Sequence, residues 1–344
     1  MQKRTILITG GAGFIGSHLV KYMVDKYPLY DIHVIDSLTY AGDKKNLKEC
    51  INKIKFHEVS ISNERIINTL FELYDFDGVI NVAAETHVDN SIDDPNVFLE
   101  TNVVGTQNLI NASLKYKINK FLQVSTDEVY GSLDFNDGRT FYEFTPFSPS
   151  SPYSASKASA DFLVLAACRT YNLPACITHC SNNYGPKQHS EKLIPKVIKC
   201  LKNNNQIPLY GDGGNIRDWI HVEDHVKALD KVFHSGKNGD RYNVGSNTEF
   251  TNLELVKKIC MTYDNIKGLV PGTSSRLISF VGDRPGHDLR YSINVDKIYT
   301  KLRWKAEINF NLGITETVNS YLYCLLYPRT YVQPYRTHKK NCGD

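Results

Sequence analysis

The amino-acid sequence predicts an α/β fold, in which a doubly wound parallel sheet is followed by a smaller C-terminal α/β lobe. Short apolar runs of strand length recur through the first half of the chain, and stretches with apolar residues at helical spacing separate them. Glycine and proline become more frequent after about residue 182. Strands that alternate with helices indicate a parallel sheet whose right-handed crossovers place helices on both faces.

Each element of this sheet is predicted from its own pattern. The first strand spans residues 5–9 and stops at a glycine, and residues 14–24 follow as a helix because their apolar side chains recur on one face. A second strand over residues 32–35 ends on Asp36. The same patterns predict strands at 55–59, 78–82, 121–124 and 175–179, and helices at 63–74, 101–115 and 152–171.

The domain organisation follows from the change in composition. Residues 1–182 are predicted to form the sheet domain, and residues 183–327 a nucleotide-sugar-binding lobe that closes over the mouth of the sheet, with an interleaved boundary between the two. Ligands of such sheets bind at the carboxyl ends of the strands. The polar, aperiodic stretch 328–344 is expected to be a loosely attached tail.

Charge and cysteine content exclude several classes of protein. A formal net charge of +3 is too small to indicate nucleic-acid or membrane binding. The 8 cysteines are scattered, and no two form a CxxC pair, so we expect free thiols and no metal site. The N-terminus leads directly into the first strand with no signal peptide, and no apolar run could span a bilayer. A cytoplasmic protein is expected.

A glycine-rich loop joins the first strand to the first helix. It reads Gly10-Gly11-Ala12-Gly13-Phe14-Ile15-Gly16, and its glycines let the backbone approach a pyrophosphate at the helix N-terminus. Asp36 stands where the adenosine ribose hydroxyls bind, and its charge would repel a 2′-phosphate. The alternative is a glycine-rich turn beside a surface aspartate. The context favours a Rossmann-type domain that binds NAD rather than NADP.

Tyr153 and Lys157 are four residues apart at the start of the helix introduced by Ser151-Pro152. This spacing places both side chains on one face. A tyrosine with its ordinary pKa near 10 is a poor base at neutral pH. We expect the lysine ammonium and the positive helix N-terminus to favour the phenolate. The alternative is an accidental pair on an amphipathic helix.

The glycine loop and the Tyr-Lys pair together resemble the extended short-chain dehydrogenase/reductases that act on nucleotide sugars. The resemblance extends to about residue 327. Within it, Thr126-Asp127-Glu128 is similar to the signature of the nucleotide-sugar 4,6-dehydratases, whereas related epimerases carry small neutral residues there. The resemblance implies that Glu128 is the base at carbon 5 and Asp127 the acid at carbon 6. Asp127 must then have a pKa raised by burial and by neighbouring carboxylates. The alternative is an N-cap-like acidic turn.

The resemblance also implies contacts with cofactor and substrate. Arg217 and Arg284, both expected in turns of the smaller lobe, suit a bidentate clamp on a diphosphate. The implied substrate contacts are His87, Thr126, Asn183, Lys192, Tyr210, Arg217, Asn252, Arg284 and His287. The implied cofactor contacts are Gly10, Gly13, Phe14, Ile15, Gly16, Asp36, Ser60, Ile61, Ala83, Tyr153 and Lys157, and the implied catalytic residues are Thr126, Asp127, Glu128, Tyr153 and Lys157.

Two positions depart from the pattern of the bacterial dTDP-glucose enzymes. Ser60 precedes Ile61 where those enzymes usually have an aspartate, so the carboxylate expected to accept from the adenine amino group is missing. Asn90 replaces an arginine, and Thr86 to Asn90 instead resembles the plant UDP-glucose 4,6-dehydratase domains. The sequence therefore leaves dTDP-glucose and UDP-glucose open as substrates.

The implied activity is that of a lyase that converts a nucleoside-diphosphate-glucose to the 4-keto-6-deoxy sugar and water, with transient hydride storage on bound NAD. A homodimer is expected, with the helices over 101–115 and 152–171 paired across a two-fold axis, as in the resembling family. A UDP-sugar 4-epimerase or decarboxylase on the same scaffold is the nearest alternative. A non-catalytic NAD-binding sensor is another, although such proteins typically lose the Tyr-Lys pair.

Overall fold

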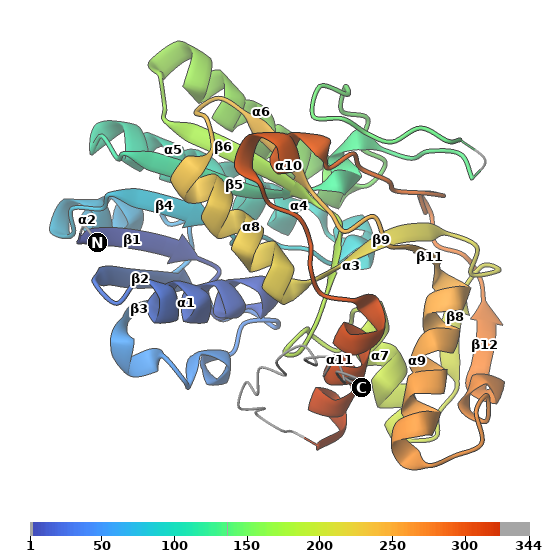
Figure 1. Ribbon diagram of the computed structural model, residues 1–344. Coiled ribbons are helices and arrows are strands. Elements are labelled where there is room, and N and C mark those ends of the chain that lie inside the picture. Colours follow the sequence, from blue (N-terminus) through green and yellow to red (C-terminus); the bar gives the residue numbers. More distant parts are fainter. Residues whose placement is uncertain (1–2, 136, 324–344) are drawn as a thin grey trace, which may run out of the picture.

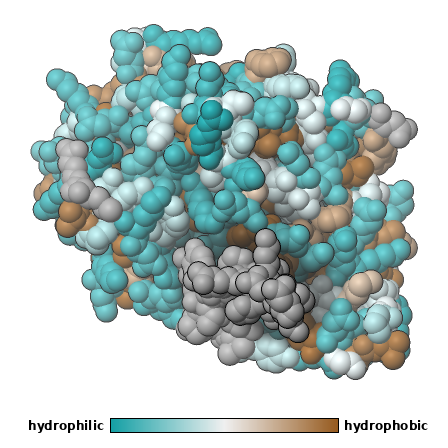
Figure 2. Space-filling model, viewed as in Figure 1, coloured by the Kyte–Doolittle hydropathy of each residue, from teal (hydrophilic) through white to brown (hydrophobic). Residues whose placement is uncertain are grey.

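The structure is a computed structural model, and it describes residues 3–135 and 137–323. The predicted tail over residues 328–344 lies outside the described residues. None of the helices in the described part of the chain is long and apolar enough to cross a membrane. The face seen in Figure 2 is covered mostly by hydrophilic side chains, with hydrophobic residues in patches between them.

A seven-stranded parallel sheet forms the centre of the larger domain (Figure 1), and its strand order is β10-β6-β5-β4-β1-β2-β3. The predicted fold class is confirmed, and six of the strands lie where the sequence places them. Their bounds are β1 Arg4–Thr9, β2 Tyr30–Asp36, β3 Ile54–Glu58, β4 Gly78–Asn81, β5 Lys120–Thr126, β6 Ala175–Cys180 and β10 Arg241–Val244. The sequence patterns did not predict β10, which pairs with β6 in parallel.

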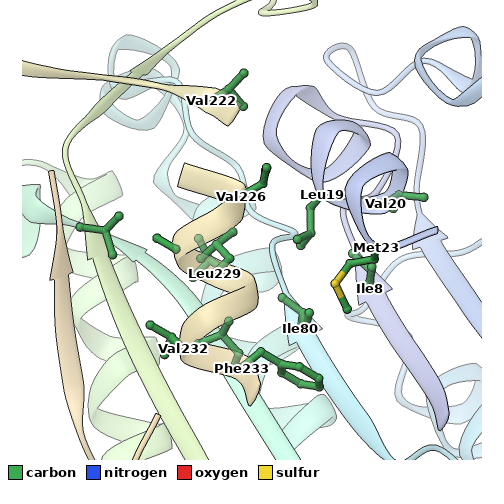
Figure 3. Packing of buried hydrophobic residues seen from close by; sticks show 14 of the residues in the cluster. Ile8, Leu19, Val20, Met23, Ile80, Val222, Val226, Leu229, Val232 and Phe233 are labelled. Carbon is green, nitrogen blue, oxygen red and sulfur yellow. The ribbon is translucent and has the colours of Figure 1, made fainter. Parts of the chain in front are cut away.

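Helices cover both faces of this sheet. On one face lie α1 (Phe14–Lys26), α8 (Val222–Ser235) and α10 (Asp296–Leu302). Figure 3 shows Leu19 and Met23 of α1 beside Leu229 and Phe233 of α8, above strand residue Ile80. On the other face lie α2 (Glu64–Leu73), α5 (Gly105–Lys115) and α6 (Pro152–Tyr171), packed around a second apolar cluster. This double cover is what a parallel sheet with two hydrophobic faces requires.

The helix predicted over residues 101–115 is interrupted at its start. A π-helical segment, Leu99–Val104, precedes α5 and follows the short helices α3 (Val88–Asp93) and α4 (Pro95–Phe98). Within this segment the buried Asn102 amide donates to the carbonyl oxygen of Glu85 at 3.0 Å and to the hydroxyl oxygen of Ser156 at 2.9 Å. The widened turn thus ties the loop after β4 to helix α6, in keeping with the frequent occurrence of π-bulges near functional sites.

The smaller lobe has its own sheets and core. Strands β7 (Asn182–Tyr184), β9 (Ile216–His221) and β11 (Glu249–Thr251) form a three-stranded sheet, and β8 (Ile207–Tyr210) pairs with β12 (Ile278–Val281). Helices α7 (Leu193–Lys202), α9 (Asn252–Lys267) and α11 (Phe310–Tyr323) pack on them around a third apolar cluster. The chain returns to the large sheet through α8 and β10 and again through α10, so three separate stretches of chain build the lobe.

Candidate active site

A cavity of about 340 Å³ lies at the carboxyl ends of β1, β4, β5 and β6, beneath the smaller lobe. Its size is within the range of small-molecule sites. Its wall includes all eleven residues that the sequence assigned to the cofactor: Gly10, Gly13, Phe14, Ile15, Gly16, Asp36, Ser60, Ile61, Ala83, Tyr153 and Lys157. Residues from five separate stretches of the sequence are thereby brought to one place.

The glycine-rich loop is shaped by close backbone approaches. Gly10 has a φ of +65°, and a side chain there would place its Cβ 2.7 Å from the Cα of Ala83. Only glycine fits this conformation without strain. The carboxylate of Asp36 accepts from the backbone N–H of Ala12 at 2.9 Å and from that of Leu38 at 2.8 Å, so it is fixed at the cavity wall. A loop that turns tightly on glycine and a fixed carboxylate beside it are features of a dinucleotide-binding site.

Residues 186–192 of the smaller lobe cross the cavity and are fastened to the larger domain. We call them the closing segment. Gln188, His189, Glu191 and Lys192 line the cavity. The contacts that fasten it are His18 Nε2 with Pro186 O at 3.0 Å, Lys187 Nζ to Asn46 O at 2.8 Å, Tyr40 Oη to Glu191 Oε1 at 3.3 Å and Lys192 Nζ to Thr86 O at 2.7 Å.

The Tyr-Lys pair lies in the first two turns of α6. Ser151 caps this helix in a capping box with Ser154, and the proline that follows Ser151 occupies the first turn. Tyr153 and Lys157 are both buried, and the Lys157 ammonium donates to the carbonyl oxygen of Val124 at 2.8 Å. Burial lowers the pKa of Lys157, although the nearby Asp161 carboxylate acts to raise it.

The surroundings of Tyr153 act against the phenolate that was expected from Lys157 and the helix end. Burial raises the pKa of Tyr153 well above its ordinary value, and the Glu128 carboxylate raises it further. The sequence shows the neighbours of Tyr153 along the helix but not how deeply its side chain is buried, which is why this effect was not predicted.

The adjacent carboxylates follow directly after β5, in a single 3₁₀ turn, Asp127–Tyr130. The Thr126 hydroxyl accepts from the backbone N–H of Glu128 at 3.3 Å and lies 3.4 Å from Asp127 Oδ1, to which it donates. Thr126 thus caps the turn, as the alternative of an N-cap-like acidic turn predicts. Both carboxylates nevertheless line the cavity beside Tyr153, where a capped surface turn would not place them.

The surroundings of Asp127 and Glu128 act differently on the pKa values of the two carboxyl groups. Burial, Glu128 and Asp218 together raise the pKa of Asp127 well above its ordinary value, and Asp127 Oδ2 has no hydrogen-bond partner among the described residues. Burial also raises the pKa of Glu128, but Arg284, Arg217 and Lys192 act to lower it. The prediction for the pKa of Asp127 is confirmed in direction and cause.

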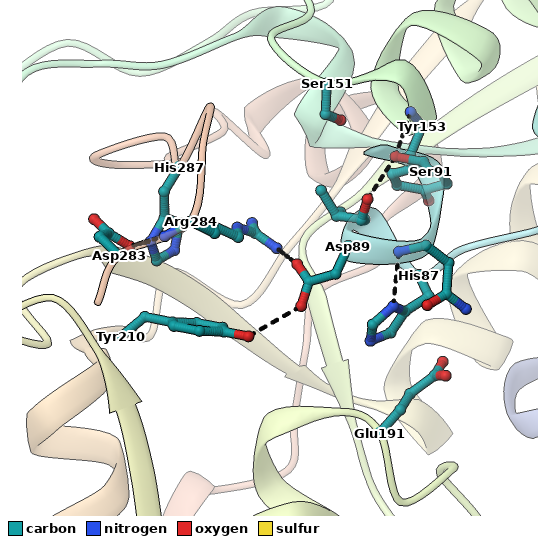
Figure 4. A network of polar contacts seen from close by, with 12 residues as sticks. His87, Asp89, Ser91, Ser151, Tyr153, Glu191, Tyr210, Asp283, Arg284 and His287 are labelled. Carbon is teal, nitrogen blue, oxygen red and sulfur yellow. Dashed lines mark hydrogen bonds and ion pairs between the residues drawn. The ribbon is translucent and has the colours of Figure 1, made fainter. Parts of the chain in front are cut away.

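The residues predicted to bind substrate are divided between the cavity wall and its surroundings. Thr126, Asn183 and Lys192 line the cavity. His87 caps helix α3, accepting from the backbone N–H of Asn90 at 3.2 Å, and Asn252 is the first residue of α9. Tyr210, Arg284 and His287 gather on the lobe side (Figure 4), where Asp283 holds His287 at 2.6 Å.

The prediction that Arg217 lies in a turn is wrong. It is buried in strand β9, with its guanidinium 4.1 Å above the ring of Tyr291. Its η nitrogens donate to the carbonyl oxygens of Ile216, Asp288 and Leu289. The strand was missed because the buried polar residues Arg217, Asp218 and His221 interrupt its apolar ones. Of the two predicted clamp arginines, only Arg284 lies in a loop.

Sequence reasoning missed several residues of the site. Cys180 ends β6 and lines the cavity, but it had been treated as one of the scattered thiols. Asp218 is buried within the electrostatic reach of Asp127. Asp89, in the segment from Thr86 to Asn90, accepts hydrogen bonds from Arg284 and Tyr210 of the smaller lobe. Its position at the carboxyl end of a predicted strand could have indicated that Cys180 belongs to the site.

Comparison with known proteins identifies the family. The family model described as GDP-mannose 4,6 dehydratase matches residues 7–317. The chain belongs to this family. A probable dTDP-glucose 4,6-dehydratase of Sinorhizobium fredii is 46% identical over 330 residues, which is 92% of this chain and 92% of that protein. The dTDP-glucose 4,6-dehydratase of Haemophilus influenzae is 44% identical, over 92% of this chain and 98% of that protein.

Solved structures agree with this assignment. The dTDP-glucose 4,6-dehydratase DesIV of Streptomyces venezuelae, solved with NAD bound, is 40% identical with a TM-score of 0.86, over 92% of this chain and 97% of that one. The UDP-glucose 4-epimerase of Thermus thermophilus, solved with NAD, has a TM-score of 0.84 but is only 27% identical, over 93% and 100% of the chains. The backbone is thus common to both activities, and the sequence favours the dehydratases.

Proposed function

We propose that this chain is an NAD-dependent nucleotide-sugar 4,6-dehydratase, a hydro-lyase that converts a nucleoside-diphosphate-glucose to the 4-keto-6-deoxy sugar and water. The observation that carries the proposal is the Asp127–Glu128 pair, which lines the same cavity as Tyr153 and the glycine-rich loop. The two acids have different electrostatic surroundings. A neutral acid beside a carboxylate base is what the loss of water from adjacent carbons requires.

The cavity suits NAD as the resident cofactor. A Cβ on Gly10 would clash with the backbone of Ala83, and one on Gly16 with the carbonyl oxygen of Gly10, so these glycines allow the tight loop that holds a pyrophosphate at the helix N-terminus. Asp36 offers a fixed carboxylate to ribose hydroxyls. When bound, NAD supplies the acceptor that stores a hydride between its removal from carbon 4 and its delivery to carbon 6. The closing segment covers the cavity, which suits a cofactor that is regenerated in every cycle and need not leave.

The residues of this chain divide the proton transfers. Tyr153 takes the proton of the carbon-4 hydroxyl, and the resulting ketone acidifies carbon 5. Glu128 removes the carbon-5 proton while Asp127 gives its own proton to the departing carbon-6 hydroxyl, so that water forms. Glu128 then returns its proton to carbon 5 when carbon 6 is reduced. At the end of the cycle Tyr153 holds one proton more and Asp127 one proton fewer than at the start, so Tyr153 must give up a proton and Asp127 must take one up before the next cycle.

We propose that a homodimer is the functional form and that the enzyme is cytoplasmic. Phe162 on α6 is 56% exposed, and Val104, next to α5, is 43% exposed, so the face predicted to pair carries unburied apolar side chains. The cysteines of the described residues are free, in keeping with a reducing compartment. Light scattering of the purified protein tests the dimer, and a monomer at micromolar concentration would contradict it.

Product identification tests the activity. Purified protein is incubated with dTDP-glucose and, separately, with UDP-glucose, and products are identified by mass and NMR. The proposal expects a product lighter by one water, with a ketone at carbon 4 and a methyl group at carbon 6. A product of unchanged mass with inverted carbon 4 would show an epimerase instead.

A further inference from the structure

A polar contact joins the two lobes (Figure 4). Asp89, on helix α3 of the larger domain, accepts from Arg284 Nη1 at 3.2 Å and from the Tyr210 hydroxyl at 3.1 Å. Arg284 and Tyr210 both belong to the smaller lobe, and both donate to this one carboxylate of the larger domain. The bridge therefore joins residues that are 195 and 121 positions apart in the sequence.

The carboxylate of Asp89 is charged and held in place. Partial burial acts to raise its pKa, but the hydrogen bonds and the charge of Arg284 outweigh this effect, so the pKa lies below its ordinary value. Helix α3 is itself anchored, because Ser91 accepts from the backbone N–H of Tyr153 at 3.2 Å. Asp89 is thus an anion fixed to the turn that carries the catalytic tyrosine.

Arg284 is only partly satisfied by this contact. One η nitrogen reaches Asp89, whereas its buried Nε has no hydrogen-bond partner among the described residues. A buried donor without an acceptor in a native site calls for an explanation such as an absent ligand. A guanidinium can satisfy several donors at once on the oxygens of a phosphate. The other predicted clamp residue, Arg217, already donates to three backbone carbonyls.

We propose that Asp89 occupies Arg284 in the ligand-free enzyme as an internal stand-in for the substrate diphosphate, and that the diphosphate takes Arg284 from it on binding. This inference rests on the proposed function, since it names Arg284 as a ligand of the nucleotide. Asp89 then lowers the affinity for every nucleoside diphosphate, substrate and product alike. An interaction that weakens both equally costs little in turnover and speeds product release.

The Asp89→Asn variant tests this inference. The amide keeps the size of the side chain and removes its charge, so Arg284 is freed for the diphosphate. We expect dTDP and UDP, titrated calorimetrically, to bind the variant roughly two- to five-fold more tightly, as for removal of one partly exposed ion pair. Binding of thymidine, which has no diphosphate, should be unchanged. Asp93→Asn, which removes the same charge at an exposed position of α3, is the matched control.

A double-mutant cycle tests whether Asp89→Asn tightens nucleotide binding through Arg284. In an Arg284→Met background, Asp89→Asn should no longer tighten dTDP, because the two residues act through one contact. An equal gain with and without Arg284 would mean simple repulsion between Asp89 and phosphate, and would overturn the proposal. So would a gain of the same size for thymidine, or weaker binding of dTDP. If the wild-type protein binds neither dTDP nor UDP, the proposed function fails instead.

Discussion

Replacing Asp127 by asparagine should separate the catalytic role of this carboxyl group from its effect on stability. The side chain is buried, its Oδ2 has no hydrogen-bond partner among the described residues, and its pKa is raised by burial, by Glu128 and by Asp218. Asparagine has the same shape but cannot give up a proton. Removal of a positioned acid typically costs on the order of a hundred-fold in rate, or about 2.7 kcal/mol of activation free energy.

The same substitution should stabilise the protein. The folded enzyme holds the proton of Asp127 more tightly than the unfolded chain does. This carboxyl therefore favours folding below its unfolded pKa, and its contribution is lost as the pH rises toward the folded pKa. Asparagine has no such dependence. The difference in unfolding temperature between variant and wild type should therefore grow in favour of the variant as the pH rises from about 5 to about 8.

Two measurements check both parts. Product formation gives the turnover number, and calorimetric unfolding at several pH values gives the stability. Asp134→Asn, at an exposed position a few residues away, serves as the control for a change of net charge and should alter neither quantity by much. Near-normal turnover would remove Asp127 from the mechanism. A pH-independent difference in unfolding temperature, or a variant less stable than wild type throughout, would show that Asp127 is not a buried neutral acid.

The remaining predictions concern the base, the cofactor and the nucleotide. Glu128→Gln should still allow oxidation at carbon 4 but block loss of water, so absorbance of reduced nicotinamide should persist on the variant, whereas wild type shows no net accumulation during turnover. Ser60→Asp should tighten NAD by up to about 1 kcal/mol in a titration of apo-protein, unless the Ser60–Ser62 hydroxyl pair already serves the adenine. Lys187→Met, which loses the bond to Asn46 O, should release NAD several-fold faster in an exchange experiment, and an unchanged rate would mean that the closing segment does not retain it. dTDP-glucose and UDP-glucose should be turned over with specificity constants within about a hundred-fold of each other, since a ring methyl contributes only roughly 1–3 kcal/mol.

The sheet was predictable from the sequence where local pattern and tertiary role coincide. Strands β1, β2, β4, β5 and β6 are largely apolar runs that stop at turn residues, and their helices carry one apolar stripe, so burial on both faces is visible in the residue order. In β3, apolar residues alternate with polar ones. β10 and β9 lack this property. β10 is four residues long within a polar stretch, and β9 turns Arg217 and Asp218 inward, where they are satisfied by backbone groups of distant loops. Residue order does not show such partners.

In the site, too, features set by local sequence were predictable, and features set by burial in the fold were not. The cofactor residues were predictable because the physical demand is local: a backbone that must turn tightly needs glycine at fixed offsets, wherever the rest of the chain lies. The pKa of Tyr153 was not predictable in the same way, because it depends on how deeply the side chain is buried. Tyr153 and Asp127 were expected to shift in opposite directions, yet burial raises the pKa of both. The shared cause matters for the mechanism. Desolvation keeps the proton on the phenol until a positive charge enters the cavity, and it keeps the proton on the acid that must deliver one.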